Sequence, residues 1–115
     1  MRIEIHCPST VRASEECLIR AVLFNDSYVP VDISRNAFIG PDVEDPSATG
    51  APRPSSVEPT FGGPDQPLTL HPFSFYGRQR SFTGLSPGEI TVTARYRGLQ
   101  GEPEISATQR IHVQP

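Results

Sequence analysis

Apolar and polar residues alternate along several short stretches of the chain, which is the pattern of β-strands that bury one face. The first stretch, residues 2–7, places Ile3, Ile5 and Cys7 on one side. It ends at Pro8, which cannot donate a hydrogen bond to a strand ladder. We therefore predict an opening β-strand over residues 2–7.

The clearest alternation lies near the end of the chain, over residues 90–96 and 105–113. These two stretches flank a Gly-rich turn, so they predict an antiparallel hairpin. Both alternations agree only if the numbers of paired residues sum to 201, which sets Ile90 opposite Ile111. A register shifted by one residue would turn the polar face inward.

Residues 14–25 contain an apolar run that fits either a helix or a strand. Ser14 followed by two glutamates is a good helix start. As a strand, the run would place Ile19, Ala21 and Leu23 on one face and further apolar residues on the other. We favour a central strand covered on both faces, whereas a helix here would indicate an α+β fold.

Proline dominates the middle of the chain. A turn cluster at 25–27 leads into an alternating stretch, 29–33, which predicts another strand of the main fold. Residues 40–67 contain seven of the 13 prolines and four glycines, so we expect a long Pro/Gly-rich loop insertion there. The only regular element expected within it is a short strand at 57–61.

Two more strands are predicted after this loop. Leu68 and Leu70 indicate the first, and residues 78–83 form the second. The segment between them, residues 71–77, is rich in turn-forming residues.

The composition favours one small all-β domain. A chain of 115 residues is long enough for a single core, and we assign residues 1–115 to one domain. Its 13 prolines and 9 glycines are too many for a helical bundle and suit short strands joined by turns. The net charge of −3 provides no positive field for nucleic acid or an anionic membrane, so we expect neither as a partner.

The sequence also allows a prediction of where in the cell the protein lies. No apolar stretch near Met1 has the length of a signal peptide or of a membrane span, so we expect a cytoplasmic protein. Two cysteines at apolar positions in a reducing compartment are usually inert, and we expect Cys7 and Cys17 to be free thiols.

Two segments carry a resemblance to a known family. Residues 18–31, Leu-Ile-Arg-Ala-Val-Leu-Phe-Asn-Asp-Ser-Tyr-Val-Pro-Val, resemble the passage from strand B to strand C of stand-alone bacterial immunoglobulin-like domains. Residues 85–96, Leu-Ser-Pro-Gly-Glu-Ile-Thr-Val-Thr-Ala-Arg-Tyr, are similar to their E to F corner, although Ile90 stands where these domains usually carry tyrosine. The resemblance implies an immunoglobulin-like antiparallel β-sandwich of about seven strands. Such families include intracellular proteinase inhibitors and accessory domains of secreted proteases.

No arrangement of residues indicates catalysis, a metal or a cofactor. The neighbours His6 and Cys7 would point to opposite faces of a strand, and no nucleophile motif is present. Zinc needs four ligands at characteristic spacing, which neither His6 nor His112 has around it. Four acidic residues of the proline-rich loop could be considered as calcium ligands, but they lack the spacing of a calcium loop: Asp42, Glu44, Asp45 and Asp65. We therefore expect a protein that is not an enzyme and has no cofactor.

The loops at one end of the predicted sandwich are the candidate binding surface. In an immunoglobulin-like domain three loops gather at one end, and here they are residues 25–30, 71–77 and 98–103. The middle loop carries several aromatic residues, which are typical of interface hot spots. The candidate binding residues are Asp26, Tyr28, Phe73, Phe75, Tyr76, Arg78 and Gln100.

Two arrangements of these aromatic rings stay open, a binding surface with at least two rings exposed or a plug that closes the end of the core. The first predicts a non-catalytic module that binds another protein, of which the resemblance implies an intracellular protease inhibitor as the sharpest form. The alternative is a structural or assembly subunit, such as a decoration or lattice protein, whose proline-rich loop is ordered by neighbouring copies.

Overall fold

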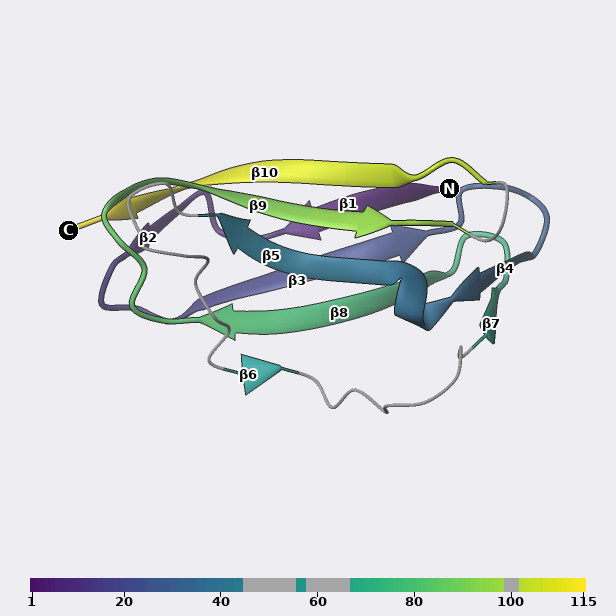
Figure 1. Ribbon diagram of the computed structural model, residues 1–115, viewed down its shortest axis with the longest axis horizontal. Coiled ribbons are helices and arrows are strands. Elements are labelled where there is room, and N and C mark those ends of the chain that lie inside the picture. The colour runs from purple at the N-terminus through teal and green to yellow at the C-terminus, as the bar shows by residue number, and fades with distance from the viewer. Residues whose placement is uncertain (45–55, 58–66, 99–101) are drawn as a thin grey trace.

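The computed structural model describes residues 1–44, 56–57, 67–98 and 102–115 (Figure 1). Over these residues the chain is all-β, with ten strands and one short 3₁₀ turn, η1, at Arg35–Ala37. The strands are β1 (Arg2–His6), β2 (Thr10–Arg12), β3 (Cys17–Phe24), β4 (Val31–Ser34), β5 (Phe38–Glu44), β6 (Ser56–Val57), β7 (Pro67–Leu70), β8 (Phe75–Phe82), β9 (Gly88–Tyr96) and β10 (Ile105–Gln114). The described residues include no helix long and apolar enough to cross a membrane.

The strands form two four-stranded sheets and one two-stranded ribbon. The first sheet has the order β1-β3-β8-β6 and is antiparallel throughout. The second has the order β2-β10-β9-β5, in which only the short strand β2 runs parallel to its neighbour. The ribbon pairs β4 with β7 and lies at one end of the molecule, near the start of β1 (Figure 1).

The core lies between the two large sheets. One cluster joins Ile19 and Phe82 of the first sheet to Val92 and Ile111 of the second, and all four side chains are buried. A second cluster, built around Leu23 and other side chains from both sheets and the ribbon, continues the core toward the ribbon end. The two sheets therefore pack face to face through their inward-pointing residues.

The alternation in the sequence explains strand β3. The side chains of Cys17, Ile19, Ala21 and Leu23 are all fully buried, which confirms a strand and not a helix in this region. The expectation that both faces are covered is wrong at Leu18, whose side chain is 49% exposed. The strand begins at Cys17, after a turn that contains the residues expected to start it.

The predicted hairpin is confirmed in its register. Every paired position of β9 and β10 has residue numbers that sum to 201, including Ile90 with Ile111 and Ala94 with Ala107. Ile90 and Ile111 are both buried, as the alternation requires.

The middle of the chain differs from its prediction. Residues 40–44 are not part of a loop but belong to β5, which is the strand that pairs with β9. Their alternation is hidden by Gly40 and Pro41, which lie at a register shift, and proline is tolerated here because β5 is the last strand of its sheet. The stretch predicted as a strand at 29–33 is β4, which joins neither large sheet.

The other loop predictions are also revised. Of the short strand predicted at 57–61, the structure shows β6 at Ser56–Val57, and residues 58–61 lie outside the described part. Pro67 was predicted to be the last residue of the loop, but it is the first residue of β7. Strand β8 starts at Phe75, three residues earlier than predicted, because Phe75 pairs directly with Phe24 of β3.

Gly40 is required by its close approach to β9. Its φ of +114° lies in the region that favours glycine, and a Cβ at this position would stand 2.8 Å from the carbonyl oxygen of Thr93. The absence of a side chain therefore lets β5 pack against β9 at the bulge.

Two arginines close the side of the molecule where β8 faces β5. Arg78 and Arg80 lie in the inward row of β8, opposite Ala21 and Ile19. Arg78 donates to backbone carbonyls of Phe38 and of the η1 turn, and Arg80 donates to the carbonyl of Pro41 at 3.2 Å. Because backbone groups without partners are costly, these bonds stabilise the outermost strand of the second sheet.

Candidate functional site

Two of the three predicted loops meet at the ribbon end of the molecule. The backbone N–H of Phe73 donates to the carbonyl of Asn25 at 2.8 Å, and the N–H of Asn25 donates to the carbonyl of Ser74 at 3.0 Å. The loop after β3 and the loop before β8 are therefore joined directly, as the three-loop arrangement predicts.

The side chain of Asn25 holds this junction together. It is fully buried, and its amide nitrogen donates to the carbonyls of Val29 and Leu70 at 2.9 Å each and to that of His71 at 3.3 Å. Its amide oxygen accepts from the N–H and the hydroxyl of Ser27. One side chain thus joins both loops, because its amide nitrogen bonds carbonyls of both and its amide oxygen is bonded to the first.

Three aromatic rings protrude from this frame. The exposed fractions are 86% for Tyr28, 50% for Phe73 and 53% for Phe75, which confirms the expectation that at least two rings are exposed. The rings of Tyr28 and Phe73 meet edge to face with centres 5.1 Å apart. We name this surface, with the exposed Val29, the aromatic end.

Two guanidinium groups flank the aromatic end on the outer face of the first sheet. That of Arg2 lies 4.8 Å from the centre of the Phe24 ring, and that of Arg20 lies 5.3 Å from the centre of the Phe75 ring. Both distances are within the range of a cation–π interaction.

Tyr76 and Arg78 do not join the exposed surface. The ring of Tyr76 is half-buried, packs against the core and lies 6.0 Å from the ring of Phe38. Arg78 is half-buried and donates to backbone carbonyls between the sheets, as described above. Of the aromatic candidates, Tyr76 is therefore a core residue at the end of the fold.

Asp26 lies beside the aromatic end but is already paired. One of its carboxylate oxygens stands 2.7 Å from the amino group of Met1. The hydrogen bond from this amino group holds the pKa of the Asp26 carboxyl below its ordinary value. Gln100, the remaining candidate, lies outside the described residues.

The third loop ends at the same side of the molecule. Glu102 and Pro103 line a hollow of about 310 Å³ together with Met1, Val31 and Tyr96. The hydroxyl of Tyr96 also accepts a hydrogen bond from the backbone N–H of Ser34 at 3.2 Å, which ties β9 to the ribbon.

Sequence reasoning missed three residues of this region, namely Asn25, Phe24 and Arg20. Asn25 was recognised only as a turn residue, and the turn cluster could have indicated no more than the bond that its amide oxygen accepts from the N–H of Ser27. Phe24 and Arg20 become part of the surface through the pairing of β3 with its neighbours, which the sequence of β3 alone does not contain.

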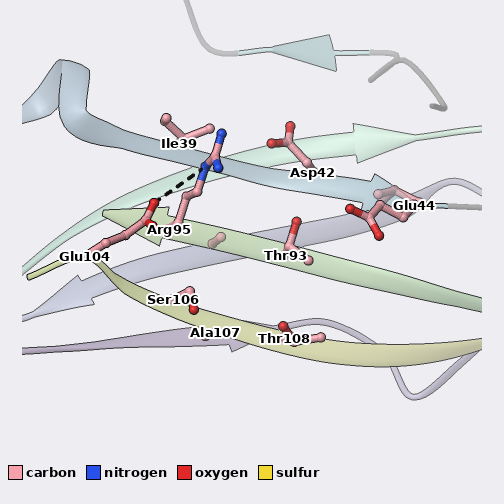
Figure 2. Close-up of a pocket in the computed structure, with 11 residues that line it drawn as sticks. Ile39, Asp42, Glu44, Thr93, Arg95, Glu104, Ser106, Ala107 and Thr108 are labelled. Carbon is pink, nitrogen blue, oxygen red and sulfur yellow. Dashed lines mark ion pairs between the residues drawn. The ribbon is translucent and has the colours of Figure 1, made fainter. Parts of the chain in front are cut away.

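A groove of about 550 Å³ crosses the outer face of β5, β9 and β10 (Figure 2). Short side chains such as Thr93 and Ser106 form its floor, and longer ones such as Arg95 and Glu104 rise beside it (Figure 2). Three of its charged side chains are paired, since Arg95 lies 4.0 Å from Glu104 and Asp42 lies 2.8 Å from Arg80. The groove is open and its lining mixes polar and apolar side chains, whereas a small-molecule site is usually enclosed and mostly apolar.

The thiols and carboxylates in the described part of the chain lie apart from one another or in pairs. No three residues of the types His, Cys, Asp and Glu lie there in a group that could hold a metal ion. Asp45 and Asp65 fall outside that part. Cys7 and Cys17 are both free thiols, and burial raises the pKa of each, which disfavours the nucleophilic thiolate form.

No protein-family model matches the chain, and no curated protein is significantly similar to it in sequence.

Proposed function

We propose that this chain is an immunoglobulin-like domain that binds another protein through its aromatic end. The observation that carries the proposal is the exposure of Tyr28, Phe73 and Phe75 on a frame fixed by Asn25. Large exposed rings on a rigid frame favour binding, because they offer apolar area and lose little conformational entropy on association.

The order of the strands supports the immunoglobulin-like assignment. In such domains strands A, B, E and D form one sheet and strands C, F and G form the other. The first sheet here fits this order if β1, β3, β8 and β6 are A, B, E and D. The second fits if β5, β9 and β10 are C, F and G. The ribbon of β4 and β7 then elaborates the loops after strand B and before strand E.

Inhibition of a protease is one form of this function. An inhibitory loop has to resist cleavage, and a loop resists cleavage when its backbone is held in place. The loop at Phe73 is held at both ends of its turn, through the bonds of Asn25 and through a bond from the N–H of Ser74 to the carbonyl of His71 at 3.1 Å. Serine, cysteine and metalloproteases are therefore the first enzymes to assay with the purified protein.

Cross-linking from single positions tests the proposal. A photoreactive phenylalanine analogue placed at position 28 should capture a partner in an extract of the source cells. The matched control carries the same group at Arg110, which is exposed on the outer face of the second sheet. Capture of the same partner from both positions, or from position 110 alone, would place the binding surface elsewhere.

The size of the purified protein separates this function from the structural alternative. A binding module is expected to be a monomer in solution, because its aromatic end is reserved for a different protein. A defined oligomer or lattice that dissociates when Tyr28 and Phe73 are replaced by alanine would instead indicate an assembly subunit.

A further inference from the structure

A row of cationic and aromatic side chains adjoins the aromatic end on the outer face of the first sheet. In the strand register Arg2 faces Phe24, and Phe24 in turn faces Phe75. Arg20 and Phe24 lie an even number of positions apart in β3, so their side chains point to the same face of the sheet. The guanidinium of Arg20 lies over the Phe75 ring on that face.

The side chain of Arg20 lies over Gly77. Gly77 stands between Phe75 and Gln79 on β8, opposite Val22. A Cβ on Gly77 would lie 3.3 Å from Nε of Arg20 and 3.4 Å from one of its terminal nitrogens. The guanidinium thus lies over a position without a side chain and beside a ring.

The charges on this face differ in how they are paired. Arg2 binds Glu4 at 3.0 Å, and Glu4 also lies 3.4 Å from His6. The carboxylate of Asp26 binds the amino group of Met1. Among the residues that the structure describes, Arg20 has no carboxylate partner, and its side chain is exposed.

We infer that the aromatic end selects a protein segment in which a carboxylate stands next to an apolar side chain. Arg20 would bind the carboxylate, and Phe75 with its neighbours would contact the apolar side chain. This inference rests on the proposed function and adds the chemistry of the partner. A guanidinium can bind a carboxylate through two parallel hydrogen bonds, which is the strongest form of this pair.

A carboxylate fits this surface better than a phosphate. Recognition of phosphorylated segments relies on clusters of arginines. Here the second guanidinium on the face, that of Arg2, is already occupied by Glu4. One available guanidinium beside apolar rings matches a single carboxylate with an apolar neighbour.

Three capped pentapeptides test the inference by nuclear magnetic resonance. The sequences are Ala-Leu-Asp-Phe-Ala and its variants with asparagine or phosphoserine at the central position. Each is titrated into the labelled protein, and the readouts are the Nε–Hε signal of Arg20 and the backbone signals of residues 73–75. We expect the aspartate peptide to bind about tenfold more tightly than the asparagine peptide.

Variants of the protein identify the source of this preference. Arg20→Gln should reduce the affinity for the aspartate peptide to that for the asparagine peptide. Arg12→Gln removes the same charge at a distant site, and it should leave the affinities for both peptides unchanged. Gly77→Ala keeps the charge and places a Cβ 3.3 Å from Nε of Arg20, so the guanidinium has to shift by a few tenths of an ångström. This variant should weaken the aspartate peptide less than Arg20→Gln does and leave the asparagine peptide unchanged.

The outcomes separate this inference from the proposed function. Equal binding of the aspartate and asparagine peptides, with shifts at residues 73–75, would overturn the acidic preference and leave the aromatic end as a binding surface. Tighter binding of the phosphoserine peptide than of the aspartate peptide, with a shift at Arg20, would show that the surface prefers a phosphate to a carboxylate. If no peptide shifts the signals of the aromatic end at millimolar concentration, the inference is wrong, and cross-linking from position 28 still decides the proposed function.

Discussion

Replacement of Asn25 by alanine should destabilise the protein strongly, because this buried side chain joins two loops from inside. The change removes five hydrogen bonds and leaves the buried carbonyl of Leu70 without its donor. The carbonyls of Val29 and His71 are only partly buried and can regain water. One buried group without a partner costs about 1–3 kcal/mol, and the lost bonds add to this, so we expect a loss of about 2–4 kcal/mol.

Urea denaturation measures this loss as a shift of the midpoint of unfolding, with the slope of the unfolding free energy against urea unchanged. Asn36→Ala is the matched control, because Asn36 is exposed in the η1 turn, and it should cost less than about 0.5 kcal/mol. A loss for Asn25→Ala below about 1 kcal/mol, or one equal to that of Asn36→Ala, would refute the role of Asn25 as the junction of the loops.

Asn25→Asp extends the same reasoning to pH. The substitution keeps the shape but turns a carboxylate toward three carbonyl oxygens, so burial and repulsion raise the pKa of the introduced carboxyl in the folded state above its value of about 3.9 in the unfolded chain. A group whose folded pKa is raised adds stability at low pH and loses it as the pH rises through the folded pKa. The variant should therefore gain stability relative to the parent as the pH falls from neutral toward 4, and an offset that does not depend on pH would contradict this.

Three further outcomes follow from the fold. Gly40→Ala should cost about 2 kcal/mol or more by urea denaturation, because the new Cβ meets the carbonyl of Thr93 at 2.8 Å and φ is positive, and a neutral result would contradict the close approach. Arg80→Ala should promote self-association in sedimentation experiments, because it frees a carbonyl on the outermost strand β5, whereas Arg110→Ala should not. The thiol of Cys17 should react with an aromatic disulfide reagent only after unfolding, since it is fully buried and burial raises its pKa, and rapid reaction of the folded protein would contradict this.

The parts of the fold that were predictable are those in which local pattern and burial coincide. In β3, β9 and β10, apolar residues occupy alternate positions that all face the core, so both the strands and the register of the hairpin follow from the sequence. Strand β5 was missed because a bulge at Gly40 and Pro41 interrupts its alternation, and proline otherwise indicates a loop.

The candidate site was predictable in its place and less so in its members. Tyr28, Phe73 and Phe75 are recognisable as aromatic residues among turn residues, and loops of this kind meet at one end of a two-sheet domain. The inward position of Tyr76 depends on the start of β8, which the turn-rich segment before it conceals. The position of the Arg20 guanidinium depends on Gly77, which is far away in the chain and becomes its neighbour only through strand pairing.

The most direct test of the central claim is the affinity of the cross-linked partner, once purified, for three forms of the protein. Calorimetric titration compares the parent with the double variant Tyr28→Ala/Phe73→Ala and with Leu18→Ala, which removes an exposed apolar side chain at the other end of β3. The account predicts that the double variant loses about 2 kcal/mol or more of binding free energy, or roughly 30-fold in affinity, while the control binds like the parent. Equal affinities of all three forms, or a loss confined to Leu18→Ala, would contradict the claim that the aromatic end is the binding surface.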